Sequence, residues 1–148
     1  MAKVPEVDPS RIYVAGHSSA GTVALLTAEH EPRIAGCIAY APCSDVEDFL
    51  SEALSDPFLP RFLPGLREFA KRSSPRTHVA KLKCPTFLFQ AADDSVVDAN
   101  TTRQFRSLLQ AQGTSVTYKE VPSGDHYDPM IESGIPAAIA WINGLANQ

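Results

Sequence analysis

The stretch IYVAGHSSAGTVALLTAEHEP, residues 12–32, passes from β-branched apolar residues through a turn of small residues into a helical pattern. Residues 12–15 follow the turn sequence Asp-Pro-Ser and are typical of a short strand. Residues 19–30 predict a helix that ends before a proline, because the residue preceding a proline avoids helical geometry. The stretch therefore predicts a strand, a sharp turn and a helix.

The rest of the chain continues this alternation. Alternating strands and helices indicate a parallel sheet with right-handed crossovers, and ligands bind such sheets at the carboxyl ends of the strands. Further strands are predicted at 34–40, 85–90 and 115–121, and helices over about 100–112 and from about residue 133 onward. In the last helix, one predicted apolar face holds Ile135, Ala138, Ile139, Ile142 and Leu145. Residues 41–84 differ, because they hold two short helical patterns, DVEDFLSEAL and GLREFAKRS, among several prolines.

Length and composition exclude several classes of protein. The 148 residues fit a single domain, and a net charge of −4 argues against a nucleic-acid partner. No apolar run approaches the length that spans a bilayer, so we expect no membrane partner. Three cysteines without CxxC spacing argue against a disulfide framework and a zinc site, and we expect no metal and no cofactor. Residues 1–11 lack the apolar core of a signal peptide, which leaves the compartment open, with the cytoplasm as the default.

The turn at residues 16–21 allows three interpretations. In the simplest, its serines only cap the following helix. In the second, its GxxxxG spacing belongs to a phosphate-binding loop of a nucleotide-binding domain, but Thr22 stands where that loop needs a lysine. In the third, the turn is a nucleophile elbow, which lifts a serine hydroxyl above the carboxyl edge of the sheet.

The size of the flanking residues selects one serine for the elbow. Steric crowding in an elbow requires tiny residues two positions before and two positions after the nucleophile. Gly16 and Ala20 occupy these positions around Ser18, whereas His17 occupies the first of them around Ser19. We therefore predict Ser18 as the nucleophile.

A serine nucleophile needs a base, and the base needs an orienting acid. Asp93 and Asp94 follow the predicted third strand, and His126 follows the fourth, which is the chain order Ser, Asp, His of this kind of site. Taken singly, the aspartates are also explained by a solvated turn, and the histidine by a surface loop. Together with Ser18, however, they bring all three members of a triad to one edge of the sheet.

The sequence resembles the carboxyl-terminal half of an α/β-hydrolase, in detail the prolyl oligopeptidase (S9) and dienelactone-hydrolase-like group. The resemblance lies in VDPSRIYVAGHSSAGT (7–22), RSSPRTHVAKLKCPTFLFQAADDSVVD (72–98) and VPSGDHY (121–127). It implies a partial α/β-hydrolase fold of about four parallel strands with flanking helices, and a short helical cap insertion at residues 41–73.

The resemblance also assigns the site. The HGxxDxxV spacing of the group places the acid at Asp94 rather than Asp93, with Gln90 and Ala91 in place of its histidine and glycine, where we expect no chemistry. Catalytic residues are thus expected at Ser18, Asp94 and His126, with the backbone N–H of Ser19 in the oxyanion hole. The implied substrate is a small-molecule ester or a peptide.

One departure from the group concerns the front of the chain. A full α/β-hydrolase has more strands before the elbow, and a loop there, usually with an HG sequence, donates the second oxyanion N–H. No HG dipeptide occurs in the 148 residues, so we expect a truncated hydrolase with impaired activity. An inactive binding or interaction module is the alternative. We also expect an exposed strand edge at 12–15, with an uncovered apolar patch around Ile12 and Val14, through which the chain self-associates.

Overall fold

The computed structural model describes residues 7–145. It contains one sheet of four strands in the order β1-β2-β3-β4, and every neighbouring pair is parallel. The predicted set of parallel strands is therefore confirmed, with ends that differ by one or two residues. The strands are β1 (Tyr13–His17), β2 (Gly36–Tyr40), β3 (Thr86–Ala91) and β4 (Val116–Val121).

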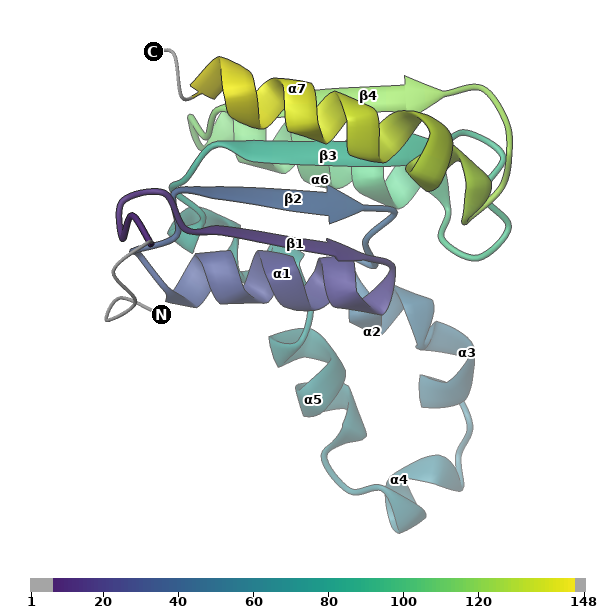
Figure 1. Ribbon diagram of the computed structural model, residues 1–148. Coiled ribbons are helices and arrows are strands. Elements are labelled where there is room, and N and C mark those ends of the chain that lie inside the picture. Colours follow the sequence, from purple (N-terminus) through teal and green to yellow (C-terminus); the bar gives the residue numbers. More distant parts are fainter. Residues whose placement is uncertain (1–6, 146–148) are drawn as a thin grey trace.

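Helices cover both faces of the sheet (Figure 1). The helices α1 (Ser19–His30) and α6 (Ala99–Ala111) lie on one face, and α7 (Ile135–Leu145) lies on the other. Two irregular turns complete these layers, a 3-10 helix η1 (Pro75–Lys81) before β3 and a π-helix η2 (Met130–Gly134) before α7. The first helix has the predicted bounds, 19–30, because small residues open it and Pro32 follows it.

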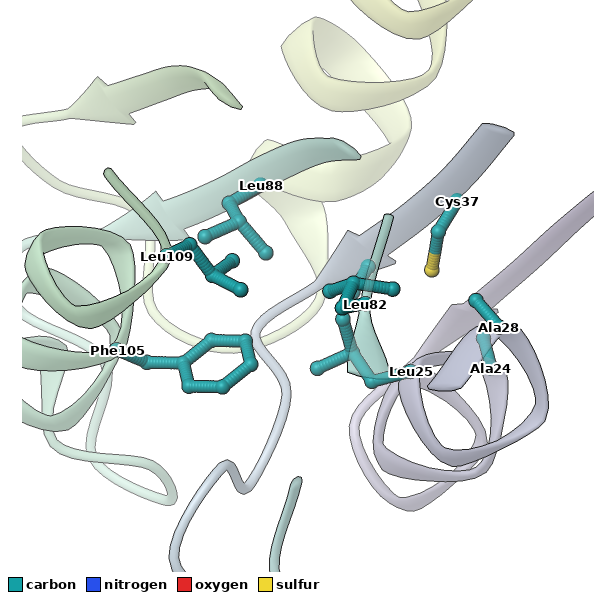
Figure 2. Packing of buried hydrophobic residues seen from close by; sticks show 9 residues of the cluster. Ala24, Leu25, Ala28, Cys37, Leu82, Leu88, Phe105 and Leu109 are labelled. Carbon is teal, nitrogen blue, oxygen red and sulfur yellow. The ribbon is translucent and has the colours of Figure 1, made fainter. Parts of the chain in front are cut away.

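The two faces of the sheet carry separate cores. Side chains alternate along a strand, so Cys37 and Ala39 of β2 face one layer, whereas Ile38 and Tyr40 face the other. In the first core, buried side chains from α1, β2, β3 and α6 pack against one another and against Leu82, which directly follows η1 (Figure 2). Burial of each large apolar side chain there contributes about 1.5–3 kcal/mol to folding. These cores fix the spacing of the strand ends, where the candidate site lies.

The predicted apolar face of the last helix is partly wrong. Ile135 and Ile139 are 39% and 55% exposed, whereas Ala138, Trp141 and Ile142 pack on the second core. The preceding turn η2 has the wider repeat of a π-helix, so it rotates the residues that follow relative to a regular helical pattern. The Trp141 ring then lies 5.7 Å from the Phe87 ring, which sets the face that α7 buries.

Residues 46–72 form a segment that projects away from the sheet (Figure 1). It holds four short helices rather than two: α2 (Val46–Phe49), α3 (Ser51–Leu54), α4 (Leu59–Phe62) and α5 (Leu66–Arg72). Several of its large apolar side chains are exposed, with Phe58 at 68% and Phe62 at 75%. Assignment of residues 41–73 as a cap stays a prediction.

The two ends of this projecting segment are joined at its base. The buried hydroxyl of Ser74 accepts hydrogen bonds from the N–H groups of Val46 (2.8 Å) and Glu47 (3.3 Å). It also donates to the carbonyl of Ala70 at 2.8 Å. The start and the end of the segment are therefore fixed to one another beside the sheet.

Strand β1 lies at one edge of the sheet and pairs with β2 only, as far as the described residues 7–145 extend. Ile12 and Val14 are half-buried, and Val14 packs against the first core. Ala15 is exposed. The expected apolar patch is thus only partly open. Within the same residues, no helix combines the length and apolar character that crossing a bilayer requires.

Candidate active site

The turn between β1 and α1 places Ser18 in a strained conformation. Its φ of 55° and ψ of −124° lie in a region that residues with a side chain rarely adopt. Such strain persists where the surroundings impose it, commonly at functional sites. Here the Ser18 N–H donates to the carbonyl of Tyr40 at 2.9 Å. Gly16 is required as well, because a Cβ at this position would overlap the Ala20 carbonyl.

The neighbouring Ser19 has a different place in the same turn. It is the first residue of α1, so its backbone N–H is among those that lack an acceptor within the helix. The positive end of the helix dipole also lies there and favours negative charge. The structure therefore places the predicted oxyanion donor, the Ser19 N–H, directly after Ser18 and at a helix start.

Asp94 and His126 form a buried pair. The Nδ1 atom of His126 lies 2.8 Å from Oδ2 of Asp94, and the two side chains are 2% and 0% exposed. A carboxylate accepts hydrogen bonds, so Nδ1 carries the proton and Nε2 of the neutral imidazole is a free acceptor. Nε2 is buried and has no hydrogen-bond partner among residues 7–145. His126 is thus not a surface-loop histidine, and its tautomer suits a general base.

Four donors hold the Asp94 carboxylate in place. Oδ1 accepts from the N–H groups of Val96 and Val97, both at 2.9 Å. Oδ2 accepts from Nε2 of Gln90 at 2.8 Å, in addition to His126. Gln90 is fully buried, and its Oε1 in turn accepts from the Thr102 hydroxyl at 3.0 Å. Gln90, to which the sequence assigned no chemistry, is therefore a direct support of Asp94.

Asp93 points to the loop before the histidine rather than to its ring. Its carboxylate accepts from the N–H groups of Gly124 (3.2 Å) and Asp125 (3.0 Å). The structure thus brings Asp94, and not Asp93, to the imidazole of His126. Asp93 is exposed and lies in a turn, as the solvated-turn interpretation has it, whereas the Asp94 side chain is fully buried.

His17 links the elbow to the histidine loop. Its Nε2 lies 2.8 Å from the carbonyl oxygen of His126, and since a carbonyl only accepts, Nε2 donates. The two imidazole rings are 4.5 Å apart. Burial lowers the pKa of His17, which favours the neutral ring. Because His17 directly precedes Ser18, this bond places the turn that bears Ser18 beside His126.

A cavity of about 160 Å³ adjoins these loops. Two of its lining residues are tied to the site: the Cys43 carbonyl accepts from the Thr22 hydroxyl in the first turn of α1 (2.9 Å), and Val97 donates to Asp94. Burial raises the pKa of Cys43 to about 11, so its thiol is protonated near neutral pH. The lining comprises Cys43, Asp45, Asp48, Phe49, Val96, Val97, Asp98 and Thr101.

No metal centre accompanies this arrangement in the part of the chain that the structure describes, where no three His, Cys, Asp or Glu side chains are grouped to hold an ion. A cavity of about 280 Å³ lies within the projecting segment, between α3, α4 and α5. Ser18, Asp94 and His126 instead lie after the carboxyl ends of β1, β3 and β4, where Asp94 and His126 are in contact.

A parallel sheet with helices on both faces, a strained serine turn after one strand and a buried Asp-His pair after two others define an α/β-hydrolase. The sequence model of the prolyl oligopeptidase family matches residues 1–141. The chain belongs to this family, whose members are hydrolases.

Relatives in sequence and in structure agree with this membership. The chain is 28% identical over 139 residues to the alpha/beta hydrolase domain-containing protein WAV2 of Arabidopsis thaliana, covering 87% of this chain and 44% of WAV2. It is 26% identical over 133 residues to a thermostable monoacylglycerol lipase of Bacillus sp. (strain H-257), covering 74% of this chain and 51% of the lipase. The solved structure of Porphyromonas gingivalis dipeptidyl peptidase 4 superposes with a TM-score of 0.75 at 20% identity, covering 99% of this chain and 21% of that chain. The chain thus spans about half the length of these curated relatives.

Proposed function

We propose that this chain carries the catalytic triad of a serine hydrolase that transfers an acyl group from a carboxylic ester or a peptide bond to water. The observation that carries the proposal is the buried Asp94–His126 pair with its unpartnered Nε2, together with the strained turn at Ser18 that the bond from His17 ties to the histidine loop. A buried nitrogen without a partner costs free energy, and a role as proton acceptor accounts for it.

The proposed reaction follows from these positions. Ser18 Oγ attacks the substrate carbonyl while Nε2 of His126 takes the hydroxyl proton. The same proton then passes to the leaving alcohol or amine, which departs and leaves an acyl group on Ser18. Water deprotonated by His126 releases the acid and restores the serine. Throughout, Asp94 holds the tautomer and stabilises the imidazolium that forms.

The oxyanion hole is the second part of the proposal. The Ser19 N–H supplies one donor, and the second donor of this class comes from a loop after an earlier strand. β1, which leads into the elbow, is the first strand that the structure describes. Loss of one donor lowers turnover by about 10²- to 10³-fold, so we propose that these 148 residues alone react slowly.

The substrate class rests on the cavity beside the site. Four of its eight lining residues, Phe49, Val96, Val97 and Cys43, form an apolar side that suits an aliphatic or aromatic group of the substrate, and three of the other four are aspartates. Its volume of about 160 Å³ accepts a group about the size of one side chain. Alcohol and amine leaving groups are both compatible with the proposal.

Labelling with a fluorophosphonate probe tests the proposal, because the probe forms a covalent bond only with an activated serine. Intact-mass measurement is expected to show one adduct on the chain, none on Ser18→Ala, and most of the wild-type adduct on Ser19→Ala, whose backbone N–H is retained. An adduct that survives in Ser18→Ala would refute the assignment. Absence of any adduct on the wild type over long incubation would favour an inactive binding module instead.

A further inference from the structure

Two aspartates outside the triad exchange hydrogen bonds between the acid loop and the histidine loop. The Asp93 carboxylate accepts from the N–H groups of Gly124 and Asp125, at 3.2 Å and 3.0 Å. In return, Oδ1 of Asp125 accepts from both the N–H and the hydroxyl of Ser95, each at 2.8 Å. Each loop thus presents one carboxylate to polar hydrogens of the other.

We propose that this reciprocal pair, the Asp93–Asp125 latch, positions His126 against Asp94. The inference rests on the proposed function, since it assigns two positioning residues to that same site. Asp93 directly precedes Asp94, and Asp125 directly precedes His126. The two adjacent carboxylates of the acid loop therefore hold two adjacent parts of the histidine loop: Asp93 holds its backbone, and Asp94 holds its ring.

The backbone of the histidine loop explains why a latch is needed. Asp125 has a φ of 61° and Gly124 a φ of 121°, and the first is unfavourable for a residue with a side chain. A Cβ at Gly124 would overlap Pro129, so the loop passes close to the start of the following helical turn. Without hydrogen bonds that fix this conformation, the segment would relax toward negative φ and turn the residue that follows it. That residue is His126.

The carbonyl side of His126 is held independently. His17 donates to its carbonyl oxygen at 2.8 Å, whereas the latch acts on the N–H of the preceding residue. Backbone bonds on both sides of His126 leave its ring little freedom to move away from Asp94. A misplacement of about 1 Å in such a site costs about 10²-fold in rate, so the latch has a measurable consequence.

If these hydrogen bonds only stabilised a surface turn, their removal would lower the stability of the chain without changing the hydrogen bond between His126 and Asp94. The test compares Asp93→Ala, Asp93→Asn and Asp125→Ala with a matched control, Asp128→Asn. Asp128 is exposed, lies two residues after His126, and its side chain has no hydrogen bond among residues 7–145. The control therefore removes the same charge near the imidazole and leaves the latch intact.

The primary measurement is the downfield proton NMR signal of the Nδ1–H of His126, assigned by its loss in Asp94→Asn and measured without substrate. We expect the signal to broaden or vanish in Asp93→Ala, to persist in Asp128→Asn, and to be partly restored in Asp93→Asn, which keeps one acceptor oxygen. With an ester substrate, kcat of Asp93→Ala is expected to fall about 10- to 100-fold with KM within about twofold of the wild type. Circular dichroism and thermal unfolding show whether Asp93→Ala keeps its fold. If it does not, the same measurements on Asp93→Asn test the proposal.

The outcomes separate the latch from the proposed function. A signal and a kcat that stay at wild-type level in folded Asp93→Ala would overturn the latch, as would equal losses in Asp93→Ala and Asp128→Asn. In the double variant Asp93→Ala with Asp125→Ala, a loss well below the product of the single losses supports one shared device. A chain that the fluorophosphonate probe does not label, but whose Nδ1–H signal depends on Asp93, refutes the hydrolase proposal and supports the latch as the device that holds the Asp94–His126 pair.

Discussion

Replacement of Asp94 by asparagine is the sharpest test of the proposed base, because the surroundings of its two oxygens dictate how the amide must lie. Oδ1 faces the backbone N–H groups of Val96 and Val97, and these cannot become acceptors. The amide oxygen of Asp94→Asn therefore takes the place of Oδ1, and the NH₂ group takes the place of Oδ2. The NH₂ group then faces Nδ1 of His126 and Nε2 of Gln90, and the Gln90 side-chain amide, unlike a backbone N–H, can turn to present its oxygen.

An NH₂ donor at this place inverts the tautomer of His126. Nδ1 must become the acceptor, so the proton moves to Nε2, the atom that has to accept the proton of Ser18. The reverse amide orientation would set an NH₂ group against two backbone N–H groups, which is less favourable. Loss of the correct tautomer in a known triad costs about 10⁴ in turnover, equivalent to about 5 kcal/mol of transition-state stabilisation.

The assay compares the rate of fluorophosphonate labelling, or of p-nitrophenyl ester turnover, in Asp94→Asn and Asp93→Asn. The former is expected to be about 10⁴-fold slower than the wild type, and the latter less than about tenfold slower, since Asp93 contacts only backbone groups. Imidazole ¹⁵N chemical shifts report which nitrogen is protonated. Equal losses in the two variants, or a slow Asp94→Asn with an unchanged tautomer, would refute the reasoning.

The fold and the sheet edge allow further predictions. Gly16→Ala is expected to destabilise the chain strongly in urea unfolding, because its Cβ overlaps the Ala20 carbonyl, whereas Gly144→Ala, which has open space, should match or exceed the wild type. Burial raises the pKa of Glu29 from 4.5 to about 8, so the folded state holds a proton that the unfolded state releases between these values. The free energy of unfolding should therefore fall as the pH rises from about 5 to 8, and it should fall less steeply in Glu29→Gln. The same dependence on pH in the wild type and in Glu29→Gln would contradict this prediction. Self-association through β1 should diminish in Ala15→Lys, since a lysine on an edge strand opposes pairing, and sedimentation velocity that shows a monomer for both proteins would contradict this proposal.

The sequence predicts those parts of the fold that local signals determine. Residues 19–30 carry their own start and stop signals, and the helix they form has those bounds. Short runs rich in β-branched, aromatic and other apolar residues predict the four strands to within a residue or two. The rotation of α7 depends on a π turn and on the contact of Trp141 with Phe87, and no local periodicity reports either of these.

The site divides in the same way. The crowding of the elbow acts between residues that are close in the sequence, so the sequence alone points to Ser18. The bond of the Ser18 N–H to Tyr40 in β2 has no such local signal. The choice between Asp93 and Asp94 required the spacing of the related family. The roles of Gln90 and Asp93 depend on partners in other loops, up to about 30 positions away. One usable signal was a polar residue at the end of an otherwise apolar strand, where Gln90 stands.

The hydrogen bonds of Ser74 at the base of the projecting segment separate changes within that segment from changes in the sheet. Ser74 bonds to both the beginning and the end of residues 46–72. The two points at which this segment joins the sheet therefore stay at a fixed separation, whatever residues lie between them. Insertions, deletions or exchange of its helices alter the loop without altering the spacing of β2 and β3, and lengthening a loop already closed costs little. The projecting segment can therefore diversify among descendants of this chain while the strand ends that carry Ser18, Asp94 and His126 keep their geometry.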